Sequence, residues 1–201
     1  MSKPVVYVVI HSLWGHIKTV AESVVEGLEA EGVEAKLFRV KETLPEEVLG
    51  KMYASTFDSI PVLEPQDLVK ADGFIFGFGT RFGAAPAQVK AFWDATGGLW
   101  ATQALAGKYG GVFTSTGTQH GGQEITISNF ISHYVHHGVL FVPLGYGTPL
   151  ISGVDEVFGG GPWGAGTLSD GNGSRQVSQR EKDIAKYQGE SFAKTIKKTF
   201  H

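Results

Sequence analysis

The sequence predicts an α/β fold in which helices cover both faces of one parallel sheet. Five segments have the length and pattern of strands, and amphipathic helical patterns lie between them. This alternation of strand and helix is typical of a doubly wound parallel sheet. The five predicted strands cover residues 4–10, 33–40, 73–78, 110–114 and 139–144.

The predicted helices begin and end at residues with known capping preferences. An apolar stripe occupies one side of residues 17–28, and Gly32 stands where a helix usually stops. Pro86 opens another helix, which we expect to end at residue 96, before Gly97-Gly98. Further helices are predicted from Pro45, over residues 65–70 and 124–137, and over residues 178–198, where Ser178 and Glu181 form a capping box.

The whole chain, residues 1–201, is predicted to form a single domain. A length of 201 residues suits one sizeable core and leaves little room for a second. Glycine is abundant, with 28 residues, and many of them lie in an irregular insertion at about residues 145–176. Within it, the stretch from Gly153 to Arg175 is long for a loop in a compact domain, and we expect it to be a functional or interface segment.

Composition excludes several classes of function. The net charge is −3 and no run of Lys and Arg could follow a phosphate backbone, so we expect no nucleic-acid partner. No apolar segment approaches the length of a transmembrane helix. The chain has no cysteine, which excludes thiol redox chemistry and thiolate metal sites, and we predict no metal site. Redox chemistry would therefore need a bound cofactor.

The loop between the first strand and the first helix has the features of a phosphate site. Free N–H groups and the positive end of the helix dipole bind anions at a helix N-terminus. Ser12 and Thr19 offer hydroxyl groups, and Gly15 lets the backbone approach a ligand closely. The loop has neither the lysine of a Walker A motif nor the glycine spacing of a dinucleotide fingerprint. It fits one phosphate monoester, as in FMN, and an ordinary strand-to-helix turn is the alternative.

Six segments match, in the same order, the motifs of a known family. Residues 11–17 are similar to its Tyr-Ser-x-Tyr-Gly-His phosphate loop, and residues 79–83 to its Pro-Thr-Arg-Phe-Gly loop. Residues 115–124 are similar to its Ser-Thr-Gly-Thr-Gly-Gly-Gly-Gln-Glu segment. The remaining matches are Gly97-Gly98-Leu99-Trp100, His136-His137-Gly138 and Gly171-Asn172-Gly173-Ser174-Arg175-Gln176. The chain therefore resembles the WrbA-type NAD(P)H:quinone oxidoreductases.

The resemblance implies a flavodoxin-like fold of five parallel strands in the order 2-1-3-4-5, with FMN as the cofactor. Residues 12–17 would hold the FMN phosphate, residues 80–82 would flank the isoalloxazine ring, and residues 115–121 would wrap its other edge. The predicted cofactor-binding residues are Ser12, Leu13, Trp14, Gly15, His16, Ile17, Phe78, Gly79, Thr80, Arg81, Phe82, Gly83, Ser115, Thr116, Gly117, Thr118, Gln119, Gly121 and His136.

The same resemblance implies three catalytic residues. The Arg81 cation would stabilise developing negative charge, and His136 would do the same or supply a proton. Trp100 would line the substrate pocket, and Trp14 stands where the family has a tyrosine associated with nicotinamide binding. An ordinary surface arginine, a helix-end histidine and packing aromatics are the structural alternatives.

The sequence also departs from the motifs of the family. His11 replaces an aromatic residue before the loop serine, and Phe78-Gly79 replaces the more usual Thr-Pro. Gln119-His120 adds a residue to the third loop. We expect flavin binding to survive these changes, and the choice between NADH and NADPH stays open.

The predicted function is FMN-dependent, two-electron, ping-pong reduction of quinones by NADH or NADPH. Such chemistry avoids the semiquinone radical, so a protective role against oxidative stress is expected. The resemblance implies a homotetramer, with a dimer as the alternative. The lack of cysteine fits an intracellular protein, so a cytoplasmic location is expected, and peripheral membrane association is left open. The alternative function is a one-electron flavodoxin-type carrier or an FMN-binding regulatory protein. The mild net charge of −3 disfavours the carrier, because such flavodoxins are usually strongly acidic.

Overall fold

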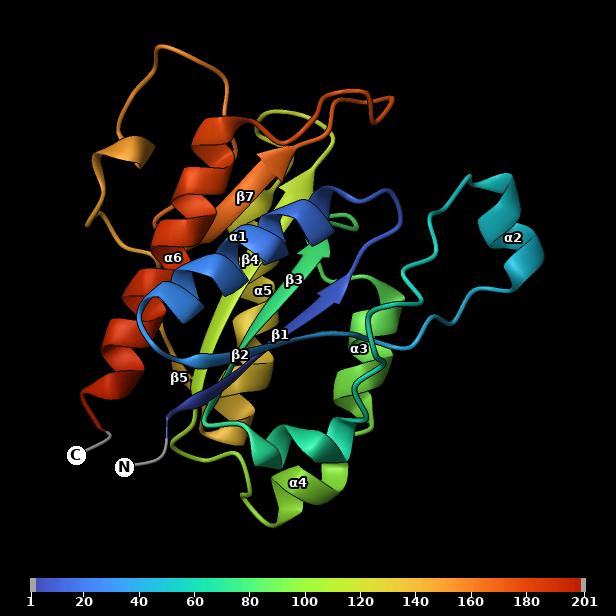
Figure 1. Ribbon diagram of the computed structural model, residues 1–201. Helices are drawn as coiled ribbons and strands as arrows, with labels where there is room; N and C mark the ends of the chain where they lie inside the picture. Colours follow the sequence, from blue (N-terminus) through green and yellow to red (C-terminus); the bar gives the residue numbers. More distant parts are fainter. Residues whose placement is uncertain (1–2, 200–201) are drawn as a thin grey trace.

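The computed structural model describes residues 3–199, in which a mostly parallel sheet has helices on both faces (Figure 1). Its strands β2, β1, β3 and β4 are neighbours in that order, and each pair is parallel. They are β1 (Val5–His11), β2 (Glu34–Arg39), β3 (Gly73–Gly79) and β4 (Tyr109–Thr116). This arrangement confirms the predicted α/β class and the first four positions of the predicted strand order.

The helices divide between the two faces of the sheet. The face in the foreground of Figure 1 carries α1 (His16–Ala30) and α6 (Gln179–Lys197). The other face carries α3 (Ala87–Asp94), α4 (Gly97–Ala101) and α5 (Gln123–His137). The short α2 (Glu46–Lys51) projects away from the sheet, and two 3₁₀ turns cover Pro65–Lys70 and Pro149–Ile151. Among these helices none has the length and apolar character needed to span a membrane.

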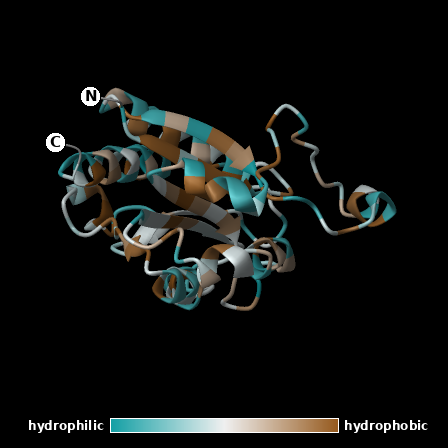
Figure 2. Cartoon of the chain, turned by 90° about the horizontal axis from the view of Figure 1, so that it is seen from below, coloured by the Kyte–Doolittle hydropathy of each residue, from teal (hydrophilic) through white to brown (hydrophobic). Residues whose placement is uncertain are grey.

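Alternating side chains of β1, an interior strand of the sheet, pack in both hydrophobic cores. Val6 and Val8 on β1 pack in the core beneath α1 and α6, whereas Tyr7 and Val9 pack in the core beneath α3 and α5. All are buried, as expected for a parallel strand covered on both faces. Figure 2 shows many hydrophobic residues on the strands and hydrophilic ones on the outer sides of the helices.

The fifth position of the sheet corrects the predicted strand order. The predicted strand at 139–144 is reduced to β5 (Leu140–Phe141), which pairs with the start of β4. The chain then leaves the sheet and returns as β7 (Gly164–Leu168), which pairs with the end of β4. The Val142 N–H still donates to the Gly110 carbonyl, but the next acceptor on β4, the Val112 carbonyl, accepts from the Gln188 side chain at 2.9 Å, so the pairing of β5 ends there.

The segment predicted to be irregular, residues 145–176, therefore contains ordered strands. In addition to β7 it holds β6 (Gly160–Gly161), which pairs antiparallel with β7. Glycine-rich strands are hard to predict because glycine usually weakens a strand. Here Gly164 is required, since a Cβ at this position would collide with the carbonyl oxygen of Val112 on β4.

Helix ends were predicted well, with one exception. The left-handed Gly138 ends α5, and the capping box of Ser178 and Glu181 starts α6, both as predicted. Gly97 and Gly98, however, were expected to follow a helix end, and they instead begin a further helix, α4. The expected single helix over 86–96 is thus α3, which ends at Asp94, followed by a second short helix.

Candidate functional site

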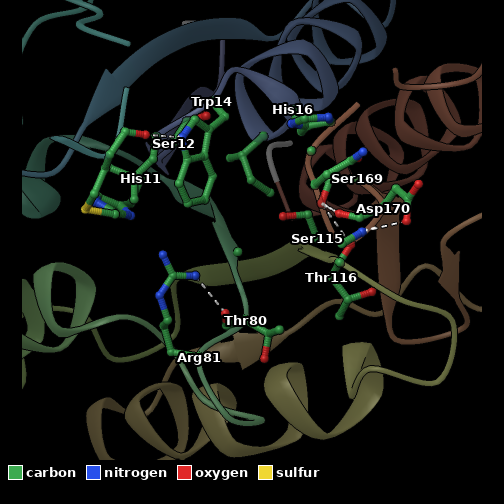
Figure 3. A pocket seen from close by; sticks show the side chains of 18 of the residues that line it. His11, Ser12, Trp14, His16, Thr80, Arg81, Ser115, Thr116, Ser169 and Asp170 are labelled. Carbon is green, nitrogen blue, oxygen red and sulfur yellow. Dashed lines mark hydrogen bonds between the residues drawn. The ribbon is translucent and has the colours of Figure 1, made fainter. Parts of the chain in front are cut away.

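A pocket of about 540 Å³ opens at the carboxyl ends of β1, β3 and β4 (Figure 3). The three loops predicted to meet there do so, because parallel strands end at one edge of the sheet. Residues from 11–17, 79–81 and 115–117 line the pocket. Two further segments, residues 52–53 and 169–173, complete its walls.

The loop between β1 and α1 presents backbone donors to the pocket. Gly15 has a φ of 94°, a left-handed conformation that favours glycine, and α1 begins immediately after it. No side chain caps the N-terminus of α1, and its first turn contains no acidic residue. The Oγ of Ser12 accepts a hydrogen bond of 3.2 Å from the Gly15 N–H, which shapes the loop. The free N–H groups of the first turn are therefore left for an anion.

The first loop is also tied to the segment that contains α2. The Trp14 indole Nε1–H donates to the Met52 carbonyl at 3.0 Å, and the Ser55 N–H donates to the Leu13 carbonyl at 2.7 Å. Trp14 is about half exposed and lines the pocket beside Met52 and Tyr53. This wall was not predicted, because residues 41–63 carry no clear pattern.

The loop after β3 is a tight turn closed by its own backbone. Arg81 and Ala84 exchange two backbone hydrogen bonds, of 2.8 and 3.0 Å. The Thr80 hydroxyl accepts from the Gly83 N–H at 3.1 Å and lies 2.7 Å from the Thr126 hydroxyl on α5. Phe82 sits at the tip with a φ of 54° and a fully exposed side chain. Thr80 and Arg81 thus line the pocket, whereas the Phe82 ring does not.

The loop after β4 adds hydroxyl groups on the other side. Figure 3 shows Ser115, Thr116 and Ser169 near His16, with Arg81 and Trp14 on the opposite side. The Thr116 Oγ1 donates to the Thr118 carbonyl at 2.8 Å and accepts from Gln123 at 3.1 Å. These bonds hold the loop in a fixed shape.

The wall of residues 169–173 is held by a buried ion pair. Glu181 on α6 is completely buried and accepts from the Arg175 Nη1 at 3.0 Å. It also accepts from the backbone N–H of Gly159 and Leu168 and from the Thr167 hydroxyl. The Arg175 carbonyl in turn lies 2.8 Å from Nε2 of His16, so this wall is joined to the start of α1.

The structure does not bring all predicted site residues into this pocket. Trp100 on α4 and His136 near the end of α5 are exposed and lie at the opposite end of the sheet from the pocket (Figure 1). Phe78 is buried in the core beneath α3 and α5 instead. Of the predicted cofactor-binding residues, those that do not line the pocket are Gly15, Phe78, Phe82, Gly83, Thr118, Gln119, Gly121 and His136.

One lining residue was identified in the sequence only as a departure from the family. His11 is buried at the end of β1, and its Nε2 lies 3.0 Å from Oε2 of Glu42. Burial lowers the pKa of His11, and the Arg81 cation lowers it further, while the bond to Glu42 partly opposes both. His11 therefore binds a proton less readily than a free imidazole does, because of its burial and of the Arg81 cation.

The chemistry of the lining fits FMN. A helix N-terminus without a cap suits a phosphate monoester, and hydroxyl groups suit a polyol chain. Aromatic and cationic side chains, here Trp14 and Arg81, suit a flat ring that becomes anionic when reduced. The volume lies in the range of cofactor pockets. The fold and the site together define a flavodoxin-like protein with a site for a flavin mononucleotide.

Comparisons with known proteins identify the family. The NADPH-dependent FMN reductase family matches residues 8–148, and the chain belongs to it. The NAD(P)H quinone oxidoreductase PST2 of Candida albicans is 53% identical over 196 residues, which cover 98% of each chain. The quinone-oxidoreductase QR2 of Triphysaria versicolor is 50% identical, covering 96% of this chain and 95% of that one. These matches confirm the resemblance inferred from the motifs.

Solved structures confirm the fold. A WrbA-like flavodoxin from Agrobacterium tumefaciens superposes with a TM-score of 0.68 at 24% identity, covering 98% of this chain and 99% of that one. Oxidised Flavodoxin 2 from Bacillus cereus gives a TM-score of 0.59 at 16% identity, covering 96% and 99%. The flavodoxin-like arrangement predicted from the sequence is therefore correct.

Proposed function

We propose that this chain is an FMN-dependent NAD(P)H:quinone oxidoreductase. The relatives named for this activity share about half of its residues over nearly its whole length. The observation that supports the proposal most directly is the pocket, in which the uncapped start of α1 meets the hydroxyl-rich ends of β3 and β4. Bound FMN would supply the chemistry that takes two electrons from a nicotinamide and gives them to a quinone.

The residues of the first loop bind the phosphate in this proposal. The N–H groups that follow Gly15 and the hydroxyl of Ser12 donate to its oxygens, and the α1 dipole favours its charge. Arg81 lies where a cation stabilises negative charge that develops on a flat ring. Trp14 offers an aromatic face to a planar substrate in the same pocket.

We propose further that copies of the chain associate. Trp100 and His136 lie away from the pocket of their own chain, so they would reach a flavin only in a neighbouring copy. Trp100 is 58% exposed, and Val135 and Leu140 near the end of α5 are exposed as well. Exposed apolar groups gathered at one end of a domain favour an interface. A homotetramer, or a dimer, is the expected assembly, and light scattering coupled to size exclusion measures it.

The deciding experiment is the oxidation of NADH and NADPH by the FMN-loaded protein, with and without benzoquinone. Rapid oxidation that depends on the quinone is expected, and the ratio of the two rates gives the preferred nucleotide. Full loading with FMN but no oxidation would overturn the enzyme and leave a one-electron carrier or a regulatory FMN-binding protein. Failure to bind FMN at all would overturn both.

Two broader parts of the proposal concern the cell. Two-electron reduction bypasses the semiquinone radical, so loss of the protein should increase sensitivity to redox-cycling quinones. A cytoplasmic location, with peripheral association with a membrane as the alternative, stays a prediction that cell fractionation tests. Both depend on the activity above.

A further inference from the structure

Three polar side chains from three elements meet beneath the pocket. His11 ends β1, Glu42 follows β2, and Gln88 lies on α3. His11 and Gln88 are buried, with 7% and 6% of their surface exposed. The Nε2 of His11 lies 3.0 Å from one carboxylate oxygen of Glu42, and Gln88 donates to the other at 2.6 Å. Buried polar groups connected in this way have a fixed geometry.

The surroundings of Glu42 determine the tautomer of His11. Burial opposes ionisation of Glu42, but hydrogen bonds from the Leu44 N–H, Gln88 and His11 outweigh it and lower the pKa of the carboxyl. An ionised carboxylate only accepts hydrogen bonds. His11 Nε2 must therefore carry a proton, and Nδ1 is the atom that gains and loses one. Within residues 3–199, Nδ1 has no hydrogen-bond partner and is not sealed in the core.

His11 lines two cavities. One is the pocket of about 540 Å³, and the other is a cavity of about 140 Å³. The walls of the smaller cavity are mainly apolar but include the charged side chains of Arg39, Glu42 and Asp58. A volume of this size has room for roughly four waters, at about 30 Å³ each. His11 thus still borders a second cavity when a flat ligand fills the larger pocket.

We propose that His11 supplies the proton that quinone reduction consumes, and that Glu42 positions its ring. The inference rests on the proposed function. A quinone becomes a hydroquinone by accepting a hydride equivalent, which derives from NAD(P)H, and one proton. In this step the Nδ1–H bond of the His11 cation breaks and an O–H bond forms on the quinone oxygen. Neutral His11 then regains a proton from water, for which the smaller cavity provides space.

The other polar groups of the pocket are less suited to this role. The Arg81 guanidinium is suited to stabilising negative charge and not to proton transfer. His16 has its Nε2 engaged by the Arg175 carbonyl and lies at the phosphate end of the pocket. Glu42 does not line the pocket and acts only through His11.

The charges that face His11 set the expected pH dependence. Glu42 favours its cation and Arg81 opposes it, while Arg39 and Asp58 across the smaller cavity lie 3.6 Å apart and largely offset each other. Burial dominates and lowers the pKa of His11 below its ordinary value of 6.5. The protonated form therefore declines as pH rises through the neutral range. The rate of quinone reduction should fall with it, by about tenfold per pH unit.

The test separates the two halves of the reaction by stopped flow. Mixing FMN-loaded protein with NAD(P)H gives the first half, which takes up no proton from His11, and mixing with benzoquinone gives the second. In His11→Gln the second half should be slower by about 100-fold and lose its pH dependence and solvent isotope effect. The first half and the Kd for FMN, measured by fluorescence quenching, should change by less than about threefold. The matched control is His120→Asn, because His120 is exposed and its left-handed φ of 56° suits asparagine.

A second variant keeps the proposal testable if His11→Gln folds poorly. Glu42→Gln removes the carboxylate, so the pH profile of the second half should move to lower pH. Nitrogen-15 NMR of the FMN-free protein gives a readout besides activity: Nε2 of His11 should stay protonated while Nδ1 titrates. An unchanged pH profile in both variants would show that water supplies the proton and would overturn the inference. Absence of any NAD(P)H oxidation by the wild-type protein would instead overturn the proposed function. If NMR showed that neutral His11 carries its proton on Nδ1, the inference about His11 would be overturned whatever the activity.

Discussion

The two ends of the sheet differ in what their residues do. At the carboxyl ends of β1, β3 and β4, glycine loops and hydroxyl groups surround an open pocket. At the other end, Trp93 and His137 pack with their ring centres 5.4 Å apart in a buried aromatic cluster, while Trp100 and His136 stay at the surface. Family motifs mark both ends, yet one chain assembles only the first into a pocket. A motif in the sequence therefore does not state whether its residues reach the pocket of their own chain.

The largest expected effect on stability and FMN affinity is that of a substitution at Glu181, which supports a wall of the pocket. Glu181→Ala would leave Arg175, Gly159 and Leu168 without their buried acceptor. Removing one partner of a buried ion pair costs about 3–5 kcal/mol. Urea unfolding should show this loss, and the Kd for FMN should rise at least about tenfold because the wall of residues 169–173 is no longer held.

A surface carboxylate provides the control for Glu181. Glu22 on α1 pairs with Lys18 and is about half exposed, so Glu22→Gln should change stability and FMN affinity very little. If the two variants unfold at the same urea concentration, the buried network does not hold the pocket wall. The pocket at one end of the sheet would then depend only on the backbone of its loops.

Glu181 also shows what local sequence patterns can and cannot predict. The spacing of Ser178 and Glu181 predicted a capping box, which the structure confirms. The same carboxylate also binds Arg175 and two distant backbone segments, and no local pattern reports such long-range partners. Local signals of this kind, such as apolar periodicity and helix caps, located the helices and four of the strands.

Long-range contacts also explain why the fifth strand position and part of the pocket could not be predicted. Gly164 is needed for close packing on β4, a requirement that depends on the partner strand and not on the local sequence. The three glycine loops of the pocket were predictable because each follows a strand directly. Residues 52–53 were not, because a distant contact of Trp14 brings them to the pocket. Residues 171–173 matched a family motif but were not assigned to the pocket, because the long-range contacts of Glu181 hold that wall in place.

The second prediction concerns the phosphate loop. Gly15→Ala places a side chain at a φ of 94°, which costs about 1–3 kcal/mol in backbone strain, although no atom lies within 4 Å of the new Cβ. The strain should distort the start of α1 and raise the Kd for FMN about tenfold. Fluorescence titration measures the affinity. Gly97→Ala on α4 is the control, since its Cβ also meets open space and its φ is ordinary, and an equal loss of affinity there would contradict the assignment of the loop.

The third prediction tests the far end of the sheet. Trp100→Ala should leave the Kd for FMN within about twofold, because Trp100 does not line the pocket of its own chain. Quinone turnover should fall about tenfold, and light scattering should show weaker association, if a second copy presents this side chain to the flavin. Unchanged turnover and unchanged mass would remove Trp100 from the site and leave it an ordinary surface residue.

The smallest expected effect is a pH dependence of stability at His137. Its Nε2 lies 2.9 Å from the Thr96 hydroxyl, and its Nδ1 is buried without a partner within the described residues. Burial lowers the pKa of His137, and the neighbouring His133 and His136 lower it further. Because the folded state then resists protonation, the unfolded state binds more protons as pH falls below the ordinary value of 6.5, and stability declines. Urea midpoints measured between pH 5 and pH 8 should fall on acidification less steeply in His137→Gln than in the wild type. Parallel curves for the two proteins would show that protonation of His137 does not contribute to the pH dependence of stability.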